Sequence, residues 1–445
     1  MKTEKMEPEK SVEKESNNGN MPKKMRGLKD LFLSMLGLVA MNGVIQLLLY
    51  PSISRALGED AFGDVLSMLA VVSVLATAIG TGVNYARMVA ETKGRSANGE
   101  FNLFLLISMI YVAGVSVGAS VLILKQKGIL FNLLFIVLSI LSVLRYYGDV
   151  EFRLKVNFFR FFIYYLLIAI GYVAGSFLVK FNVFGKDYSW VVAIALGEAL
   201  AVGFVCVTGD IFKGKKVLKP SKYAKENVNT AMFLLATNLI NALALQGDKI
   251  LLQIFRQGSD VTVFYVATLV GKIVALLTTP LNGVIIGYLA RYKGKFTKKF
   301  FGTATLIAVA VMAVFTAGSV LASHIFVRLI YSDIYANASP YFVFANAGQI
   351  VYFTAGTMMV IVLRFVHEKY QLIINTGYAV LFVAALIPLT MYGGIWGITW
   401  GLLGVNAVRF IAVVILGFAH TEKGGPEIPK DANENSTLTG ASLES

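Results

Sequence analysis

The sequence predicts an all-α, polytopic membrane protein with about twelve transmembrane helices in two pseudo-symmetric six-helix lobes around a central cavity. Three observations predict this fold. Long apolar segments fill the chain, the loops between them alternate between basic and charge-poor, and one long hydrophilic stretch divides the segments into two groups. The composition agrees, since 56% of the residues are hydrophobic and only 15% are charged, with a mean hydropathy of +0.69.

Each apolar segment is long enough to cross a bilayer core of roughly 30 Å at about 1.5 Å per residue. The segments are 28–50, 61–88, 101–124, 129–148, 156–179, 188–210, 230–255, 261–290, 301–322, 340–363, 371–391 and 395–418. No water reaches that depth, so their backbone groups must be satisfied within helices or closed barrels. Barrel strands are about ten residues long and alternate in polarity. These segments are longer and do not alternate, so we expect helices.

The distribution of basic residues orients the helices. Of the 40 Lys and Arg residues, about 30 fall on the side that holds both chain ends, about 7 on the other side and about 3 at membrane depth. The positive-inside rule therefore predicts a multi-pass protein of the cytoplasmic membrane with both termini in the cytoplasm. The ends themselves, 1–27 and 420–445, are polar and are expected to be disordered cytoplasmic tails. The net charge of +14 is then a topological signal, and no nucleic-acid partner is expected.

The longest internal hydrophilic stretch, 209–227, separates the sixth predicted helix from the seventh. Many transporters consist of two repeats joined in this way. We therefore predict an N-lobe over 28–211, a cytoplasmic linker over 212–227 and a C-lobe over 228–419.

A weak internal repeat supports this division. The first helix of each half ends in an external turn with an Arg, a Gly and an Asp, at Arg55 to Asp60 and at Arg256 to Asp260. A long helix that closes on a cytoplasmic Arg follows each turn. The alternative is that both arginines merely end a helix in a polar turn.

Polar side chains at membrane depth are functional candidates, because burying them in hydrocarbon is costly. At 3.6 residues per turn they form stripes on three helices. The stripes are Asn42 and Gln46 on the first helix, Asn238, Asn241, Asp248 and Lys249 on the seventh, and Thr268, Lys272, Thr279 and Asn282 on the eighth. Polar stripes on neighbouring helices predict a hydrated cavity between the lobes.

Basic residues on or near these stripes are candidates for binding a phosphate group. Lys249 and Lys272 could meet a diphosphate in the cavity as compact, strongly charged donors. Arg55 and Arg256 could do so near the outer mouth, and Arg87 near the inner mouth.

Structural roles are the alternative for each charged candidate. Lys249 is about six residues from its helix end and could extend to the membrane surface. Asp248 could pair with either nearby lysine as a packing device. Glu198 lies at membrane depth without an obvious partner in the sequence, and Arg409 lies one turn after Asn406, fairly near the cytoplasmic side. The aromatic-rich run 146–165 indicates a belt at the membrane interface and not a sugar site.

Three segments resemble polysaccharide transporters of the MOP superfamily, which also includes lipid II flippases and multidrug and toxin extrusion (MATE) exporters. The segment Tyr50–Gly63 resembles their first external turn, and Asn241–Ala267 resembles the corresponding second-half signature. Arg364–Lys369, a helix and then Tyr392–Gly397 resemble their closing pattern. The resemblance implies a MATE/MOP-like fold. It also implies transfer of polyprenyl-diphosphate-linked oligosaccharides from the inner to the outer leaflet by alternating access between the lobes.

We therefore expect a flippase for a polyprenyl-(di)phosphate-linked oligosaccharide that serves the export of cell-surface polysaccharide or another glycan. The alternative is a cation-coupled multidrug exporter of the MATE type, which would favour carboxylates within the membrane. The first helix has no Asp or Glu between Leu31 and Tyr50, and bases outnumber acids at membrane depth. Both observations favour an anionic substrate.

Other classes fit less well. Lys93–Arg95 is only a fragment of the loop signature of major-facilitator transporters. The chain has no phosphate-binding loop, metal cluster or nucleophile constellation, so neither an enzyme nor a cofactor is expected. A purely structural scaffold would leave the intramembrane lysines without a purpose. The expected partners are the lipid-linked oligosaccharide, membrane lipids and glycan-assembly proteins, and the expected state is a monomer.

Overall fold

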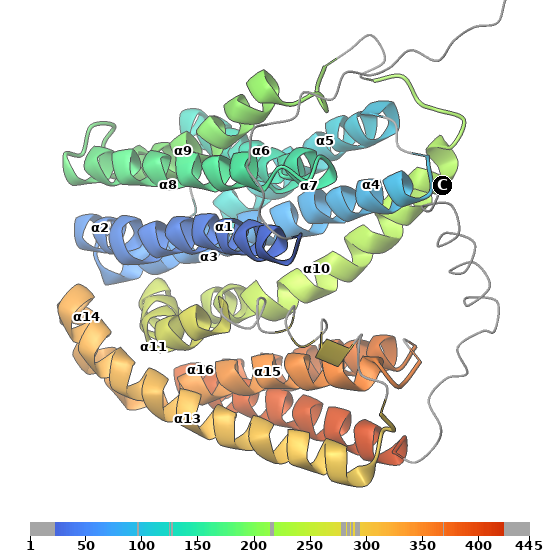
Figure 1. Ribbon diagram of the computed structural model, residues 1–445. Helices are drawn as coiled ribbons and strands as arrows, with labels where there is room; N and C mark the ends of the chain where they lie inside the picture. Colours follow the sequence, from blue (N-terminus) through green and yellow to red (C-terminus); the bar gives the residue numbers. More distant parts are fainter. Residues whose placement is uncertain are drawn as a thin grey trace, which may run out of the picture.

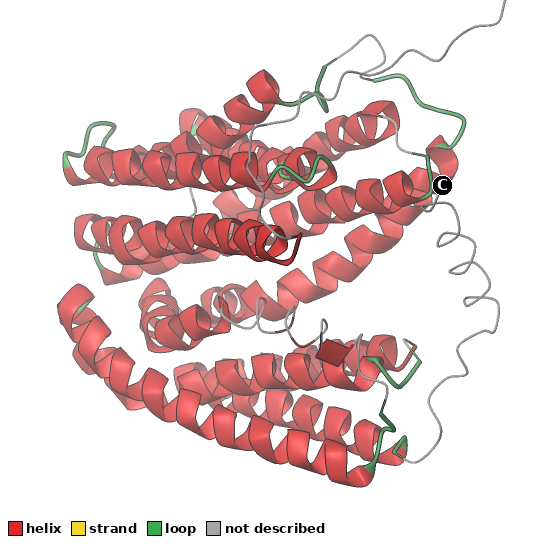
Figure 2. Cartoon of the chain, in the orientation of Figure 1, coloured by secondary structure: helices red, strands yellow, loops and turns green. Residues whose placement is uncertain are grey.

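The computed structural model describes residues 23–95, 98–123, 125, 128–213, 218–276, 282, 285, 288–289, 294–367 and 369–421. These residues form helices joined by short loops, and none of them forms a strand (Figure 2). The predicted all-α membrane fold is thereby confirmed. The outer parts of the predicted tails, 1–22 and 422–445, lie outside the described residues.

The N-lobe contains six spans. The first consists of α1 (Lys23–Val44), η1 (Ile45–Leu49) and α2 (Tyr50–Leu57), and the second of α3 (Glu59–Leu75), η2 (Ala76–Thr81) and α4 (Gly82–Thr92). The others are α5 (Asn98–Ile123), α6 (Ile129–Gly148) with the short α7 (Val150–Leu154), α8 (Phe158–Lys180) and α9 (Lys186–Thr208). α1 thus begins at Lys23, within the segment predicted as a tail. The segments η1 and η2 are π-helical, a feature that periodicity does not predict and that is frequent at functional sites.

The C-lobe contains α10 (Ala224–Phe255), α11 (Gly258–Leu276), α13 (Lys298–Ile330), α14 (Ser332–Ala338), η3 (Ser339–Tyr341), α15 (Phe342–Leu363) and α16 (Lys369–Ala419). α16 has 51 residues and is interrupted at Gly394, whose φ of 55° and ψ of −133° are not helical. At about 1.5 Å per residue it is long enough to cross the membrane twice. Ten described helices are long and apolar enough to cross a membrane. Dividing α16 at Gly394 and adding the apolar α11 accounts for the twelve predicted spans.

The helices form two bundles with α10 and α11 between them (Figure 1). α10 is hydrogen-bonded to the N-lobe along its length. Near the start of α10, Asn227 Nδ2 donates to Glu100 Oε1 at 2.7 Å. Further along, Gln246 Nε2 donates to Ser73 Oγ at 3.2 Å, and near the end Gln253 donates to α3. α10 therefore packs as part of the N-lobe, although it opens the second half of the sequence.

The two Arg-Gly-Asp turns predicted to be equivalent lie against each other at one end of the helices. A Cβ atom at Gly63 would lie 1.6 Å from the carbonyl oxygen of Gly258, and a Cβ at Gly258 would lie 2.1 Å from the carbonyl oxygen of Asp60. Only glycine allows the two backbones to approach so closely. The first turns of α3 and α11 are therefore in direct contact.

The tyrosines of the run 146–165 lie mostly inside the N-lobe. Tyr147, Tyr164 and Tyr165 are at most 5% exposed, and the Tyr164 hydroxyl donates to the backbone oxygen of Arg145 at 2.7 Å. The predicted interfacial belt is therefore wrong for these residues. Their hydroxyl groups find partners within the bundle, so the rings pack in the core instead of anchoring at the membrane surface.

Candidate functional site

A polar cavity of about 220 Å³ lies between the N-lobe bundle and the pair α10 and α11. Its walls come from the first span, α3, η2, α6, α8 and α9 on one side, and from α10 and α11 on the other. The charged and polar residues that line it are Asn42, Gln46, Tyr50, Ser73, Ser142, Arg145, Tyr146, Tyr172, Glu198, Gln246, Lys249, Tyr265 and Lys272. A cavity therefore lies where the polar stripes predict one, with Asn42, Gln46, Lys249 and Lys272 in its walls.

The wall formed by α10 and α11 carries two lysines. The Lys272 Nζ is 2.9 Å from Asp248 Oδ2, and the other oxygen of Asp248 accepts the backbone N–H of Lys249 at 2.8 Å. The Lys249 ammonium donates to Gln246 Oε1. Lys249 is only 8% exposed. Its side chain therefore lies in the cavity and does not extend to the membrane surface.

The opposite wall carries a buried ion pair that joins α6 to α9. The Arg145 Nε and Nη2 atoms donate to the two carboxylate oxygens of Glu198 at 2.7 and 3.2 Å. The Tyr172 hydroxyl donates to Glu198 Oε1 at 2.7 Å. The guanidinium carbon of Arg145 lies 4.0 Å from the centroid of the Tyr146 ring, which is close enough for a cation–π contact. Glu198, which had no evident partner in the sequence, is thus fully engaged with this wall.

The cavity has more positive than negative charge. Three cations line it, and two of them are each paired with a carboxylate, Arg145 with Glu198 and Lys272 with Asp248. Lys249 has only the Gln246 amide as a hydrogen-bond partner among the described residues. One positive charge is therefore left without a counter-charge from the described part of the chain. Such a site attracts an anion.

The first span contributes the amide groups of the cavity. Asn42 Nδ2 donates to the carbonyl of Leu38 at 2.8 Å, one turn earlier in α1. Gln46 lies in η1, and its buried Oε1 atom has no hydrogen-bond partner among the described residues. A buried acceptor without a partner costs free energy, so this position favours a bound group or water that can donate to it.

Aromatic rings pack together at the end of the cavity that is predicted to be external. Tyr50 and Tyr265 line the cavity, and their ring centroids are 5.8 Å apart at an angle of 76°. Phe62 packs against both rings, and Tyr331 at the end of α13 packs against Phe62 and Tyr265. These four side chains come from both lobes, so they join the lobes at this end of the cavity.

Hydrogen bonds between the lobes reinforce this closure. Arg55 Nη2 donates to the backbone oxygen of Ile330 at 3.1 Å. The Ser259 backbone N–H donates to Asp60 Oδ1 at 2.9 Å, and the Thr262 hydroxyl donates to a carbonyl in the first turn of α3 at 2.7 Å. Parting the lobes at this end would break all three bonds.

Four other candidates lie away from the cavity. Arg55 is part of the contact between the lobes just described, and Arg256 Nη2 donates to the backbone oxygen of Tyr392 at 3.5 Å. Arg87 is buried, and it donates to the Tyr147 hydroxyl at 2.6 Å. Asn241 is exposed on α10. The structure therefore brings none of these four residues together with Lys249 and Lys272.

Of the remaining stripe residues, two bond within their own helices and one bonds to α15. Asn238 donates to the carbonyl of Leu234 in its own helix, and Thr268 donates to carbonyls one turn earlier in α11. Asn282 Oδ1 accepts from the Thr357 hydroxyl at 2.8 Å. Thr279 lies outside the described residues.

Arg409 lies in the C-lobe, apart from the residues that line the cavity. Its guanidinium carbon is 4.7 Å from the Tyr352 ring centroid and 5.0 Å from that of Tyr378. Its Nη2 atom donates to Asn375 Oδ1 at 3.2 Å. The two rings and the amide hold the guanidinium between α15 and α16.

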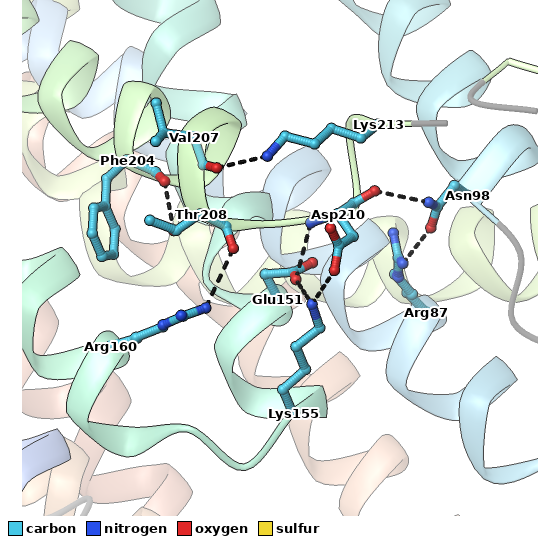
Figure 3. A network of polar contacts seen from close by, with 10 residues as sticks. All are labelled: Arg87, Asn98, Glu151, Lys155, Arg160, Phe204, Val207, Thr208, Asp210 and Lys213. Atoms are coloured by element: carbon cyan, nitrogen blue, oxygen red, sulfur yellow. Dashed lines mark hydrogen bonds and ion pairs between the residues drawn. The ribbon is translucent and has the colours of Figure 1, made fainter. Parts of the chain in front are cut away.

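A polar network around Asp210 fixes the segment that leads from the N-lobe into the linker (Figure 3). Lys155 pairs with both Glu151 and Asp210, and the Asp210 backbone N–H donates to Glu151 Oε1 at 3.1 Å. Asn98 donates to the Asp210 carbonyl at 3.1 Å. The Lys155 ammonium lowers the pKa of the Asp210 carboxyl, and these carboxylates raise the pKa of Lys155. The linker therefore begins in a fixed position on the N-lobe.

Sequence reasoning missed Arg145 and Tyr146 as cavity residues. The positive-inside rule assigns Arg145 to the basic side of the membrane, because it lies close to a basic loop. In the structure it is 8% exposed and faces Glu198. The two members of the pair are 53 residues apart on different helices, and helical spacing alone does not predict such a contact. The signal that could have indicated Arg145 was Glu198, because an acidic residue at membrane depth needs a partner.

Neither a protein-family model nor a curated protein matches the chain. Solved structures do match it. An inward-facing multidrug resistance MATE family transporter of the MOP superfamily is 15% identical, with a TM-score of 0.57 over 95% of this chain and 100% of that one. An outward-facing MATE transporter is 14% identical, with a TM-score of 0.59 over 88% and 94%. A Vibrio cholerae MATE transporter is 13% identical, with a TM-score of 0.53 over 88% and 95%. The chain is therefore a multi-pass membrane protein with the two-lobed fold of the MATE transporters.

Proposed function

We propose that this protein is a flippase that moves a polyprenyl-(di)phosphate-linked oligosaccharide from the inner to the outer leaflet of the cytoplasmic membrane. Alternating access between the two lobes would expose the cavity to each side in turn. The substrate serves the export of cell-surface polysaccharide or another glycan, and both termini lie in the cytoplasm. Membrane lipids and glycan-assembly proteins are its proposed partners, and it acts as a monomer without a cofactor.

The observation that carries the proposal is the uncompensated charge of Lys249. Its ammonium is buried in a cavity wall and bonds to the Gln246 amide, while the neighbouring Lys272 is paired with Asp248. Keeping a buried ammonium charged without a counter-ion is costly. An anionic ligand would supply that counter-ion, and hydrogen bonds to charged groups are stronger than those between neutral groups. A diphosphate headgroup fits this requirement.

The second candidate function is a cation-coupled exporter of the MATE type. The similar solved structures favour it, since the first of them is described as a multidrug resistance transporter. The carboxylate of Glu198 in the cavity wall could attract a cation. Against this reading, both Glu198 and Asp248 are already paired with basic side chains. Neither carboxylate has a spare charge to offer a cationic drug.

Transport across vesicles that contain the purified protein tests the proposal. A polyprenyl-diphosphate oligosaccharide is placed in one leaflet, and its arrival in the other is followed with a glycan-cleaving enzyme added outside. We expect transport by the wild type, loss in the Lys249→Met, Lys272→Met double variant, and retention in Lys180→Met. Lys180 is the control because it is an exposed lysine at the end of α8. Transport of cationic dyes that requires Glu198, with none of the glycolipid, would establish the exporter instead.

A further inference from the structure

The two walls of the cavity differ in charge, and this difference divides the site into two parts. We propose that the N-lobe wall, made of Gln46, Tyr50, Arg145, Tyr146 and Glu198, binds the sugar that is attached directly to the phosphate. This inference rests on the proposed function, which places the phosphate at Lys249. It assigns a second role to the same cavity, namely recognition of the first sugar of the glycan.

The N-lobe wall is neutral. The ion pair between Arg145 and Glu198 cancels its only two charges, and both oxygens of Glu198 are engaged. The excess charge lies at Lys249 on the opposite wall. A phosphate would therefore bind on the lysine side. Two groups are joined to the phosphates of a lipid-linked glycan, an apolar polyprenyl chain and a sugar. The polar N-lobe wall suits the sugar, and the polyprenyl chain belongs in the lipid.

The hydrogen-bonding groups left open on this wall are both donors and acceptors. Arg145 bonds to Glu198 through Nε and Nη2, and no hydrogen bond from its Nη1 is found among the described residues, so Nη1 can donate. The buried Gln46 Oε1 has no partner either, so it can accept. Glu198 uses three of the about four acceptor positions of a carboxylate. A phosphate can only accept and an ammonium can only donate, whereas sugar hydroxyls do both.

Aromatic rings supply the apolar part of the wall. Tyr50 and Tyr146 both line the cavity. The guanidinium carbon of Arg145 lies 4.0 Å from the centroid of the Tyr146 ring, and this contact fixes the orientation of the planar guanidinium and its N–H donors. Binding sites for small molecules combine apolar or aromatic walls with a few fixed polar groups. The C–H faces of a sugar ring would pack against the tyrosines while its hydroxyls meet Gln46 and Arg145.

The size of the cavity limits the glycan to one unit. The volume of about 220 Å³ is below the roughly 300–1,000 Å³ of typical sites for drug-sized ligands. The cavity therefore does not enclose an oligosaccharide in the conformation described here. The wall contacts the sugar next to the phosphate, and the rest of the glycan needs the space that opens when the lobes part.

Binding of two lipids to the full-length protein in mild detergent tests the proposal. The probes are polyprenyl diphosphate and the same lipid with one hexose attached, titrated by native mass spectrometry. We expect the wild type to bind the hexose lipid about tenfold more tightly, the effect of one or two added hydrogen bonds. Gln46→Leu and Tyr146→Ala should abolish this difference and leave binding of the bare lipid unchanged. Leu47→Ala is the control, since this exposed neighbour lies outside the cavity lining.

Each alternative outcome has a distinct meaning. If the wild type binds both lipids equally, or if the two variants weaken both lipids by the same factor, the sugar site is wrong while the flippase proposal stands. If the wild type binds neither lipid, the proposed function fails and the sugar site fails with it. Gln46→Leu keeps the test interpretable even if Tyr146→Ala does not fold, because it removes an amide whose oxygen has no partner to lose.

Discussion

Replacing Lys249 by Met tests whether the unpaired charge of the cavity binds the substrate. A hydrogen bond to a charged group contributes about 1.5–3 kcal/mol. Its loss should weaken binding of polyprenyl diphosphate by about ten- to a hundredfold. Folding should be unaffected, because the side chain of Lys249, a residue that is 8% exposed, bonds only to Gln246 among the described residues, and Met removes a charge that is costly to bury.

A second substitution separates charge from shape. Asp248→Asn frees the Lys272 ammonium, whose carboxylate partner lies 2.9 Å away. In the Lys249→Met background this change restores one excess positive charge to the cavity. The double variant should therefore regain most of the lost affinity, and the double-mutant cycle should show a coupling well above 0.5 kcal/mol.

Titration of the four proteins of this cycle with polyprenyl diphosphate by native mass spectrometry gives the required constants. Lys180→Met serves as the control for loss of a lysine outside the cavity. Equal affinity of Lys249→Met and the wild type would refute the reasoning. If the two substitutions change the binding free energy in a purely additive way, the balance of charges in the cavity does not determine the affinity.

Three further predictions concern stability and closure. Glu198→Ala leaves Arg145 buried without its carboxylate, so we expect the free energy of unfolding to fall by about 3–5 kcal/mol and the melting temperature to fall with it. Adding Arg145→Met should restore the melting temperature, and no recovery would argue against the ion pair. Gly63→Ala places a Cβ 1.6 Å from a backbone oxygen of α11, so amide hydrogen exchange in the first turns of α3 and α11 should become faster. Unchanged exchange would contradict the contact between these two turns. The hydrogen bond from Lys155 lowers the pKa of Asp210. The contribution of this carboxylate to the stability of the network is therefore complete above about pH 4 and is lost as pH falls through that lowered pKa. Protease cleavage of the linker should be constant from about pH 5 to 8 and should rise below about pH 4; a rise near neutral pH would rule out this carboxylate.

Much of the fold follows from simple properties of the sequence. Segment length, hydropathy and the side of the basic loops predict the spans, because each is set by the thickness and surface charge of a bilayer. The repeated turns at Gly58 and Gly258 also predicted a relation between the halves. The π-helical segments η1 and η2 could not be predicted in this way. A π-helix forms hydrogen bonds between residues five apart instead of four, and where this occurs depends on packing between helices.

The candidate site was predictable where a single helix carries the signal. Lys249 and Lys272 are charged side chains in apolar helices, and both line the cavity. Arg145 was missed because the positive-inside rule already explained a basic residue at that place in the chain. Its pairing with Glu198 depends on the relative rotation of α6 and α9. No pattern within either helix encodes that rotation.

The attachment of α10 to the N-lobe has a consequence for the transport cycle. Asp248 belongs to α10, whereas its partner Lys272 belongs to α11, which packs against α15 as well as α3. If α10 moves together with the N-lobe, the boundary between the two moving lobes runs between Asp248 and Lys272. Every turnover would then break and remake one ion pair at the centre of the membrane. The headgroup that replaces Asp248 at Lys272 would lower the energy of the broken state, so an empty carrier would change sides more slowly than a loaded one.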